Sequence, residues 1–445
     1  YKAHNIPFYL FNEAGLSELN SALNSLCSNG YIRRAIRIDF SGGSQFNSEK
    51  YQYLMNTVTG MTGTFWKNRI TLSKMGKLYA TNVFRNLINL CVSPQADTFY
   101  NKVSCPILVC GAGEGLDGFD WKDAEKKYFI IAVDAALSAL RKRNIKADAV
   151  ICVESQLAIE KAFTGIKADD TLFFLDLSSH HGLGRLSQKA VYFSTRYSDT
   201  QLLSGLKERG IINDFFNPNG SVGLTAVELA LKLRKDESVP VLVLGLDFSY
   251  SAGKTHARGT YPHINSLAAA RRNNPEGRYD EAFGENSISE NGKNSGKVYT
   301  TRILSSYADS FRNTFSREQN LYDVSKTGLP LNIPEGFSGK ADQKTCLKTG
   351  VKPEAGLSQK IKAFYREQKQ ELKKAEGLLK DGEKSIYRDT GFPLEDQLKS
   401  LLETKDYLWL HFPDGTAFSM ELSFLKRIRT EISFFIKQID IAVQD

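Results

Sequence analysis

The sequence is poor in cysteine and has no long apolar run. Its 445 residues include six cysteines; none forms a C-x-x-C pair, and no Cys/His group has zinc-site spacing. No stretch reaches the roughly 18 apolar residues of a transmembrane helix. The first residues, YKAHNIPFYLF, show no signal-peptide pattern. We therefore expect a cytoplasmic protein without a membrane span, in which apolar-run thiols such as Cys110 and Cys152 are buried and reduced.

The motifs of several enzyme classes are missing as well. There is no G-x-x-x-x-G-K-[ST], which excludes P-loop chemistry, and there is no H-E-x-x-H and no G-x-S-x-G. No Asp-x-Asp follows an expected strand, whereas metal-dependent nucleotide-sugar transferases usually have one. We therefore expect chemistry without a metal and without a resident cofactor.

The charge balance is mildly positive. The chain has 58 Lys and Arg against 50 Asp and Glu, a net charge of +8. This charge is spread over short clusters, so it gives no argument for nucleic-acid binding but fits attraction to an anionic ligand. Apolar residues make up 41% and charged residues 24% of the chain, which excludes global disorder.

The middle of the chain alternates between short apolar runs and amphipathic segments. Strands covered on both faces are predicted at 106–110, 128–134, 148–153, 171–176, 190–193 and 239–247. Helices are predicted at 135–145, 200–209, 221–234 and 301–315. This alternation predicts an α/β fold with a mostly parallel sheet and right-handed crossovers.

Three domains are expected from these patterns. Residues 1–100 carry a mixed pattern and predict a smaller α/β or helical domain. Residues 101–345 hold the predicted sheet, and the long polar segment 251–297 within them is expected to form a lid over the carboxyl ends of the strands. Residues 346–445 predict a helical domain whose amphipathic helices are candidates for contacts in a homo-oligomer.

A glycine-rich segment directly follows the apolar run at 106–110. It contains Gly111, Gly113, Glu114 and Gly115. Glycines at the end of a strand let backbone amides approach a phosphate, and an ordinary tight turn is the alternative. Position 116 is Leu, so the G-x-G-x-x-G fingerprint is incomplete and the segment predicts a nucleotide-type loop rather than an NAD site.

Polar residues also follow other predicted strands and open one predicted helix. They are Asp134, Glu154, Ser155, Gln156 and Asp247 at strand ends, and Gly220 and Ser221 before the helix at 221–234. Because the carboxyl ends of parallel strands share one edge of a sheet, these residues are expected to line a common cleft that reads ribose hydroxyls, base edges or phosphate. Helix capping is the alternative for each residue taken singly.

The expected lid brings further candidates. Lys254 and Arg258 are cations that could hold a carboxylate or phosphate, and His256 and His263 could accept a proton from a hydroxyl. Tyr299, where the lid ends, is a third candidate base. For each loop residue alone, simple solvation is the alternative.

Four segments together resemble a known family. They read CGAGEGLDGFDW, IIAVDAALSALRKRNIKADAVICVES, NPNGSVGLTAVELAL and LVLGLDFSYSAGKTHA. Their order and spacing over about residues 101–335 resemble the 6-hydroxymethylpterin diphosphokinase MptE-like domain, and more particularly the motility-associated factor (Maf) glycosyltransferases that modify flagellin.

The resemblance implies a Rossmann-like, sialyltransferase-like core. The donor would be a CMP-activated nonulosonic (sialic-acid-like) sugar and the acceptor a Ser or Thr hydroxyl of flagellin, with no metal. Gly111, Gly113 and Gly115 would form the phosphate loop, and the strand-end residues would lie near the nucleotide or sugar. The chain departs from the family at Glu114-Gly115, where Pro-Ser is usual. It also has no His just before the helix at 301–315, so the catalytic base is unassigned and His256, His263 and Tyr299 are the candidates.

Two other functions remain open. A pterin diphosphokinase would need Mg²⁺, ATP and paired carboxylates, which Asp134, Glu154 and Asp247 could supply. A nucleotide-binding or assembly protein that has lost the chemistry is favoured by Glu114 and by the missing His.

Overall fold

The computed structural model divides the chain into two compact units. The structure describes residues 16–28, 32, 34–39, 42–166, 171–186, 189–197, 200–273, 284, 286–339, 344, 347, 353–386, 395–415 and 417–444. One unit holds Tyr1–Ala80, Thr200–Ser204 and Arg366–Asp440, and the other holds Thr81–Asp199, Gly205–Tyr365 and Ile441–Asp445. Each is described by itself, and the division into 1–100, 101–345 and 346–445 stays a prediction. Residue 41, lid residues 274–283 and 285, and Cys346 lie outside the described residues.

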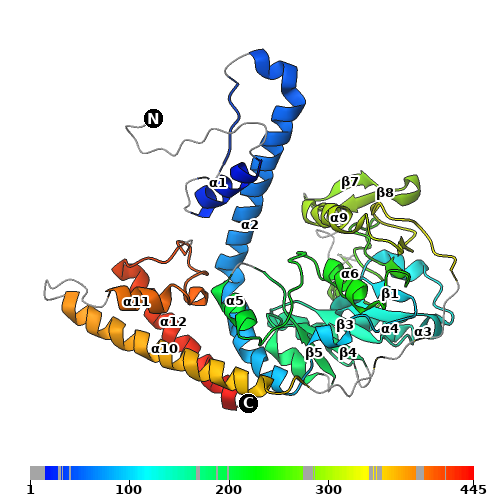
Figure 1. Cartoon of the computed structure of the whole chain (residues 1–445). Coiled ribbons are helices and arrows are strands. Elements are labelled where there is room, and N and C mark those ends of the chain that lie inside the picture. The colour runs from blue at the N-terminus through cyan, green and yellow to red at the C-terminus, as the bar shows by residue number, and fades with distance from the viewer. Residues whose placement is uncertain are drawn as a thin grey trace. The chain divides into compact units, whose positions relative to one another are not determined.

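The second unit is built around a parallel sheet of seven strands (Figure 1). Its strand order is β5-β4-β3-β2-β1-β6-β9. The strands are β1 (Ile107–Cys110), β2 (Phe129–Val133), β3 (Ala149–Cys152), β4 (Leu172–Asp176), β5 (Ala190–Phe193), β6 (Val241–Leu244) and β9 (Leu321–Asp323). Every residue of β1 to β6 is buried, as expected for strands covered on both faces. The predicted α/β class with a mostly parallel sheet is confirmed.

The strand order contains a reversal beside β1. From β1 the chain adds β2 to β5 in one direction, and it then returns to place β6 on the other side of β1. Ile107 of β1 is therefore in register with Phe129 of β2 on one side and with Val241 of β6 on the other. The chain continues from β1 to β2 on one side of this pair and from β6 to β9 on the other, and such a reversal opens a crevice at the carboxyl ends of the strands.

The described helices of the second unit are α3 (Ala124–Lys127), α4 (Asp134–Lys142), α6 (Val222–Leu233), α7 (Tyr261–Ala269) and α9 (Arg302–Phe315), and α5 (Gln201–Glu208) has residues in both units. Helices α4, α5, α6 and α9 fall on ranges predicted from the sequence, whereas α3 and α7 were not predicted. Helix α6 packs against β1, β2 and β6. Helix α9 buries Ala308, Phe311 and Phe315, as its spacing predicts.

The described residues of the expected lid include regular secondary structure. These elements are α7, the antiparallel hairpin of β7 (Ile288–Asn291) and β8 (Lys297–Thr300), and the short 3₁₀-helix η8 (Lys293–Ser295) at the hairpin tip. The sequence analysis did not predict the hairpin, because its residues are polar and largely exposed. The other 3₁₀-helices are η2 (Gly42–Asn47), η3 (Leu87–Cys91), η4 (Ala96–Phe99), η5 (Glu114–Gly118), η6 (Leu157–Phe163), η7 (His181–Arg185) and η9 (Asp406–Leu408).

The described part of the first unit is helical. Its helices are α1 (Leu16–Ser28), α11 (Glu395–Leu402), α12 (Leu422–Gln444) and most of α2 (Ser48–Asn86) and α10 (Leu357–Ile386). Ile428, Ile432 and Phe435 form a buried stripe on α12, and a buried Lys405 pairs with Glu371 at 2.7 Å. The predicted helical C-terminal region is confirmed. None of the helices in the described residues has the length and apolarity needed to cross a membrane.

Candidate functional site

A cavity of about 400 Å³ lies at the carboxyl ends of β1, β2 and β6. Its walls come from the loops after β1 and β6, from the end of β2, from the start of the lid and from the first turns of α4, α6 and α9. The lining residues are Gly111, Ala112, Gly113, Val133, Ala135, Ser221, Val222, Gly223, Gly245, Leu246, Asp247, Phe248, Ser249, Tyr250, Thr255, His256, Thr301, Leu304 and Tyr307. The cavity therefore occupies the crevice beside the reversal in strand order, where open α/β sheets bind ligands.

Three helices begin at the cavity wall. Ala135 belongs to the first turn of α4, Ser221 caps α6, and Thr301 caps α9. The Ser221 hydroxyl accepts from the Gly223 amide at 3.3 Å, and the Thr301 hydroxyl accepts from the Leu304 amide at 3.2 Å. Because helix N-termini carry partial positive charge, the wall favours an anion, although there is no Lys or Arg among the described residues that line it.

The glycine loop after β1 lies against the loop after β6. The Gly111 amide donates to the Leu244 carbonyl at 2.8 Å, and the Gly113 amide donates to the Gly245 carbonyl at 2.8 Å. The Gly115 amide donates to Asp247 Oδ2 at 2.7 Å. A Cβ at Gly113 would lie 2.7 Å from the Gly245 carbonyl oxygen. These glycines therefore allow two loops to approach each other. Their three amides are used within the protein, which differs from the predicted phosphate contact.

Asp247 is the buried acid of the cavity wall. Its residue is 2% exposed, and burial raises the pKa of its carboxyl to about 7, while the Gly115 amide and Lys293 oppose that rise and Asp323 adds to it. An acid with a pKa near neutrality can accept or donate a proton under physiological conditions. Asp247 was predicted as a nucleotide or sugar contact, and its place in the cavity fits that role.

Of the three candidate bases, only His256 lines the cavity. Its Nδ1 lies 3.1 Å from the Thr255 hydroxyl. His263 Nδ1 instead accepts from the Gly259 amide at 3.3 Å, and partial burial lowers the pKa of this imidazole. Tyr299 lies outside the lining and pairs through its backbone with Tyr250, which is a lining residue. Geometry thus favours His256 as the base.

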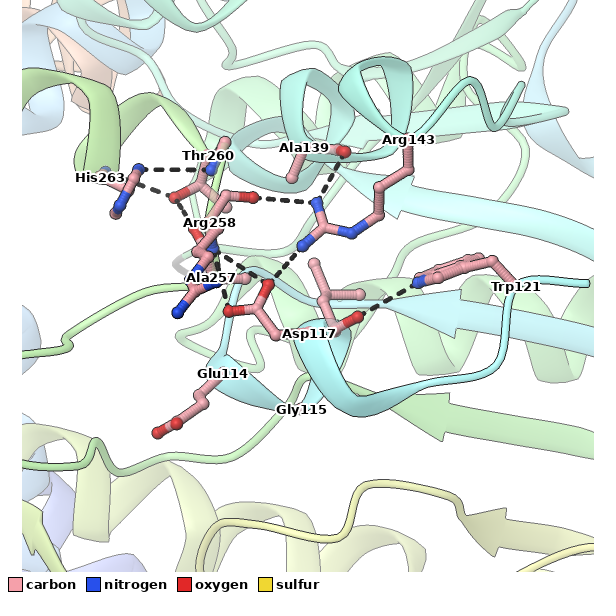
Figure 2. Close-up of polar contacts among 12 residues, drawn as sticks. Glu114, Gly115, Asp117, Trp121, Ala139, Arg143, Ala257, Arg258, Thr260 and His263 are labelled. Atoms are coloured by element: carbon pink, nitrogen blue, oxygen red, sulfur yellow. Dashed lines mark hydrogen bonds and ion pairs between the residues drawn. The ribbon is translucent and has the colours of Figure 1, made fainter.

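The predicted cations lie in an ion cluster outside the cavity lining. Lys254 Nζ is 3.0 Å from Glu114 Oε1 and 2.8 Å from Asp117 Oδ2. Asp117 also pairs with Arg143 and accepts from the Arg258 amide at 3.1 Å, as Figure 2 shows. The Arg258 side chain is exposed. The positive charge of Lys254 is therefore neutralised by two carboxylates, and the cluster fastens the start of the lid to the loop after β1.

The remaining predicted residues lie outside the cavity lining. Asp134 is buried, and its carboxylate accepts from the Ala135 amide at 2.6 Å. Burial raises the pKa of this carboxyl to about 6. Glu154 is exposed and accepts from the Gln156 amide at 2.9 Å, which is a local capping contact. Ser155 is buried, with its carbonyl bonded to Asn82.

Gly220, just before the α6 cap, has a φ of +71°, and a Cβ there would lie 3.5 Å from the Tyr307 ring. The sequence analysis missed Tyr307 itself, together with Phe248, Tyr250 and Thr301. Thr301 carried a usable signal, since a threonine that directly precedes an amphipathic segment is a typical helix cap.

Within the described residues, no group of three or more His, Cys, Asp or Glu side chains is arranged to hold a metal ion. Asp134, Glu154 and Asp247 therefore do not form a three-carboxylate metal cluster. The expectation of metal-free chemistry stays a prediction.

Comparisons with known proteins match the central segment. Residues 81–253 match the model of the family described as 6-hydroxymethylpterin diphosphokinase MptE-like. An uncharacterized protein of Treponema pallidum (strain Nichols) is 29% identical over 440 residues, which cover 91% of this chain and 74% of that protein. The structure of a MAf glycosyltransferase from Magnetospirillum magneticum AMB-1 is similar with a TM-score of 0.43 and 15% identity over 82% of this chain, which spans only 60% of that one. The segment 81–253, which includes the strands β1 to β6 and Asp247, thus matches the MptE-like family that its motifs resemble.

Proposed function

We propose that the protein is a glycosyltransferase that moves a nonulosonic sugar from a CMP-sugar to Ser or Thr hydroxyls of flagellin, without a metal. The observation that carries this proposal is the cavity at the strand reversal, with three helix N-termini and the near-neutral Asp247 in its wall. The resemblance of four sequence segments to Maf transferases supports the choice of sugar and acceptor. The family match of residues 81–253 supports the fold of the core and identifies neither the sugar nor the acceptor.

In this proposal the chemistry is a substitution at the anomeric carbon of the sugar. The bond from that carbon to the phosphate oxygen breaks, and CMP leaves with the electron pair. The acceptor hydroxyl oxygen forms the new bond, and its proton passes to His256 Nε2. The first turns of α4, α6 and α9 stabilise the departing phosphate, since they are preorganised and need no rearrangement when charge develops.

The cavity wall fits a ligand with limited negative charge. Its described lining residues offer helix ends and hydroxyls but no ammonium or guanidinium group, and Asp247 stands in the same wall. A single phosphate is better matched to this wall than a triphosphate, because each further charge would approach a carboxyl that is half ionised near pH 7. Tyr250, Phe248 and Tyr307 provide apolar area for a base or sugar ring.

Calorimetry with CMP, UMP, ADP and ATP, each with magnesium and with EDTA, tests the proposal. We expect CMP to bind equally well in both conditions, and His256→Asn to lose transfer to flagellin while still binding CMP. His263→Asn is the matched control and is expected to keep both. If no nucleotide binds at concentrations above millimolar, the proposal is wrong.

The family match favours one second candidate, a pterin diphosphokinase. It requires ATP binding that depends on magnesium, so the same titrations separate the two. Tight CMP binding together with no transfer to any flagellin would instead support a nucleotide-binding protein that has lost the chemistry.

A further inference from the structure

A buried ion pair lies behind the cavity acid. Lys293 Nζ is 2.5 Å from Asp323 Oδ2, and each side chain is only 1% exposed. Lys293 comes from the tip of the β7–β8 hairpin, and Asp323 ends β9. Removing two charges from water is unfavourable before their mutual attraction is counted. A lysine that only joined a hairpin to the sheet would not need to be charged, so this pair calls for a role.

Hydrogen bonds connect the pair to the loop that carries Asp247. The Ser325 amide donates to Asp323 Oδ1 at 3.0 Å, and Lys293 Nζ donates to the Ser325 carbonyl at 3.3 Å. The Ser325 hydroxyl in turn accepts from the Gly245 amide at 2.8 Å, two residues before Asp247. The hairpin tip, the end of β9 and the cavity wall are therefore one connected, buried structure.

The backbone makes a second connection. The Lys293 amide donates to the Gly328 carbonyl at 2.9 Å, and the Leu329 amide donates to the Asp247 carbonyl at 2.9 Å. Gly328 has a φ of +104°, and a Cβ there would lie 2.7 Å from the Asp247 Cα. The segment that receives Lys293 is thus pressed against the backbone of Asp247, so a shift of the hairpin tip reaches the acid directly.

The charges of this structure act on Asp247 in opposite directions. Lys293 favours its ionised form and Asp323 opposes it, while Glu335 acts on Asp323 and His256 shares the cavity wall. Two buried carboxyls and one ammonium cannot all be paired, so one carboxyl stays partly protonated. Because Asp323 holds Lys293 at 2.5 Å, that carboxyl is Asp247.

We propose that Lys293 is a positioning residue for the cavity: through its pair with Asp323 it sets the protonation state that Asp247 presents to a ligand. The inference rests on the proposed function only in taking Asp247 as ligand-facing. It gives the hairpin of the expected lid a chemical role at the site, because a displaced hairpin would withdraw the ammonium and leave two buried carboxyls to share a proton.

The test follows the ¹³Cγ signal of Asp247 through a pH titration of protein labelled at aspartate, with the signal assigned by Asp247→Asn. Lys293→Met should raise the apparent pKa of Asp247 by about 1 unit or more, since an opposite charge is lost. Asp323→Asn should lower it, since a like charge is lost and Lys293 is released toward Asp247. Lys297→Met, an exposed lysine of the same hairpin, is the control and should leave it unchanged.

A purely structural role for Lys293 would not produce shifts of opposite sign. The proposal is overturned if the pKa of Asp247 moves in the same direction in Lys293→Met and Asp323→Asn, or if it moves in neither variant. If Lys293→Met fails to fold, the double variant Lys293→Met/Asp323→Asn takes its place, because it removes both charges of the buried pair. Its Asp247 pKa should then exceed that of Asp323→Asn, and an equal or lower value contradicts the proposal.

The pH dependence of CMP affinity provides the functional arm. If CMP binds, the pH at which its affinity changes should move up in Lys293→Met and down in Asp323→Asn. If CMP does not bind but the carboxyl signals shift as expected, the role of Lys293 stands and the proposed function fails. The two failures are therefore distinguishable.

Discussion

Two halves of one sheet edge use similar residues in different ways. Polar residues follow β1, β2 and β6, and polar residues also follow β3 and β4. In the first half the connections diverge at the strand reversal, and Asp247 and His256 line a cavity. In the second half the end of α2 covers the strand ends. Asn82 donates to the carbonyls of Ser155 and Ser178, both at 3.0 Å. Topology therefore decides which strand-end residues can meet a ligand.

The titratable groups of the two halves differ accordingly. His181, after β4, directs its Nδ1 at 3.2 Å to Asn82 Oδ1, and burial together with nearby Arg85 lowers the pKa of this imidazole to about 4. It therefore stays neutral at physiological pH. Asp247 has a pKa of about 7 and titrates in that range. His181 in the covered half therefore keeps one protonation state, whereas Asp247 in the cavity half changes its own.

The largest expected effect is the loss of the cavity half itself. Gly111→Ala would place a Cβ against the Gly245 carbonyl and the Leu246 side chain, so the loops after β1 and β6 would have to separate. We expect a loss of about 3 kcal/mol or more in the free energy of unfolding, because backbone cannot yield as a side chain does. Chemical denaturation measures it. Gly118→Ala, where a Cβ meets nothing within 4 Å, is the matched control.

If Gly111→Ala is as stable as Gly118→Ala, the two loops are not in contact in solution. The amides of the glycine loop would then be available to a ligand, as the sequence analysis predicted for a phosphate loop.

The next effect concerns the covered half. Asn86 is buried and donates at 2.9 Å to the carbonyls of Leu177 and Ser179. Asn86→Ala leaves these carbonyls unpaired and should cost about 1–3 kcal/mol in the free energy of unfolding. CMP affinity of the folded variant, measured by calorimetry, should not change. Asn213→Ala, an exposed asparagine, is the control for stability. Lost CMP affinity in a stable Asn86→Ala would show that the β3–β4 half belongs to the site.

How far the sequence predicts this structure depends on the range of the interactions involved. Continuous apolar runs identified β1 to β6, because a strand buried on both faces needs apolar residues throughout. β9 was missed, since Leu321–Asp323 is too short to show a pattern. The hairpin was missed because polar strands at a surface look like a loop.

The site was harder to predict than the fold. Asp247 and His256 were identified by their position after a strand and in the lid, and the structure brings both to the cavity. Lys254 was identified by the same reasoning, but its charge is neutralised by Asp117, which lies two residues after Gly115. Lys293 could not be found, since its partner Asp323 is close only after β9 joins β6. Pairings between distant segments are not visible in local pattern.

A smaller effect tests the responsive character of Asp247 without any ligand. Its folded pKa of about 7 lies above the ordinary 3.8, so between these values the folded state binds the proton more tightly than the unfolded state. The contribution of Asp247 to stability is therefore present at low pH and is lost as pH rises toward 7. Asp247→Asn should remove this loss.

We expect the stability difference between Asp247→Asn and the wild type to grow with pH over this window, by at most about 1.4 kcal/mol per pH unit. Chemical denaturation of both proteins at pH 5, 6 and 7 measures it. Asp134 and Asp406 also have raised pKa values, but they are present in both proteins and cancel in the difference. A constant difference across pH would mean that Asp247 is ionised throughout, like an exposed acid.

The smallest effect is expected at the ion cluster beside the cavity. Lys254 is 25% exposed and is paired with Glu114 and Asp117. Lys254→Met should change the free energy of unfolding by less than about 1 kcal/mol, because partly exposed ion pairs contribute little. It should change CMP affinity by less than about twofold, since the charge is already neutralised. A tenfold loss of affinity at unchanged stability would mean that Lys254 leaves its carboxylates for the ligand. The cation would then belong to the cavity half, and the lid would act on the substrate directly rather than through Lys293.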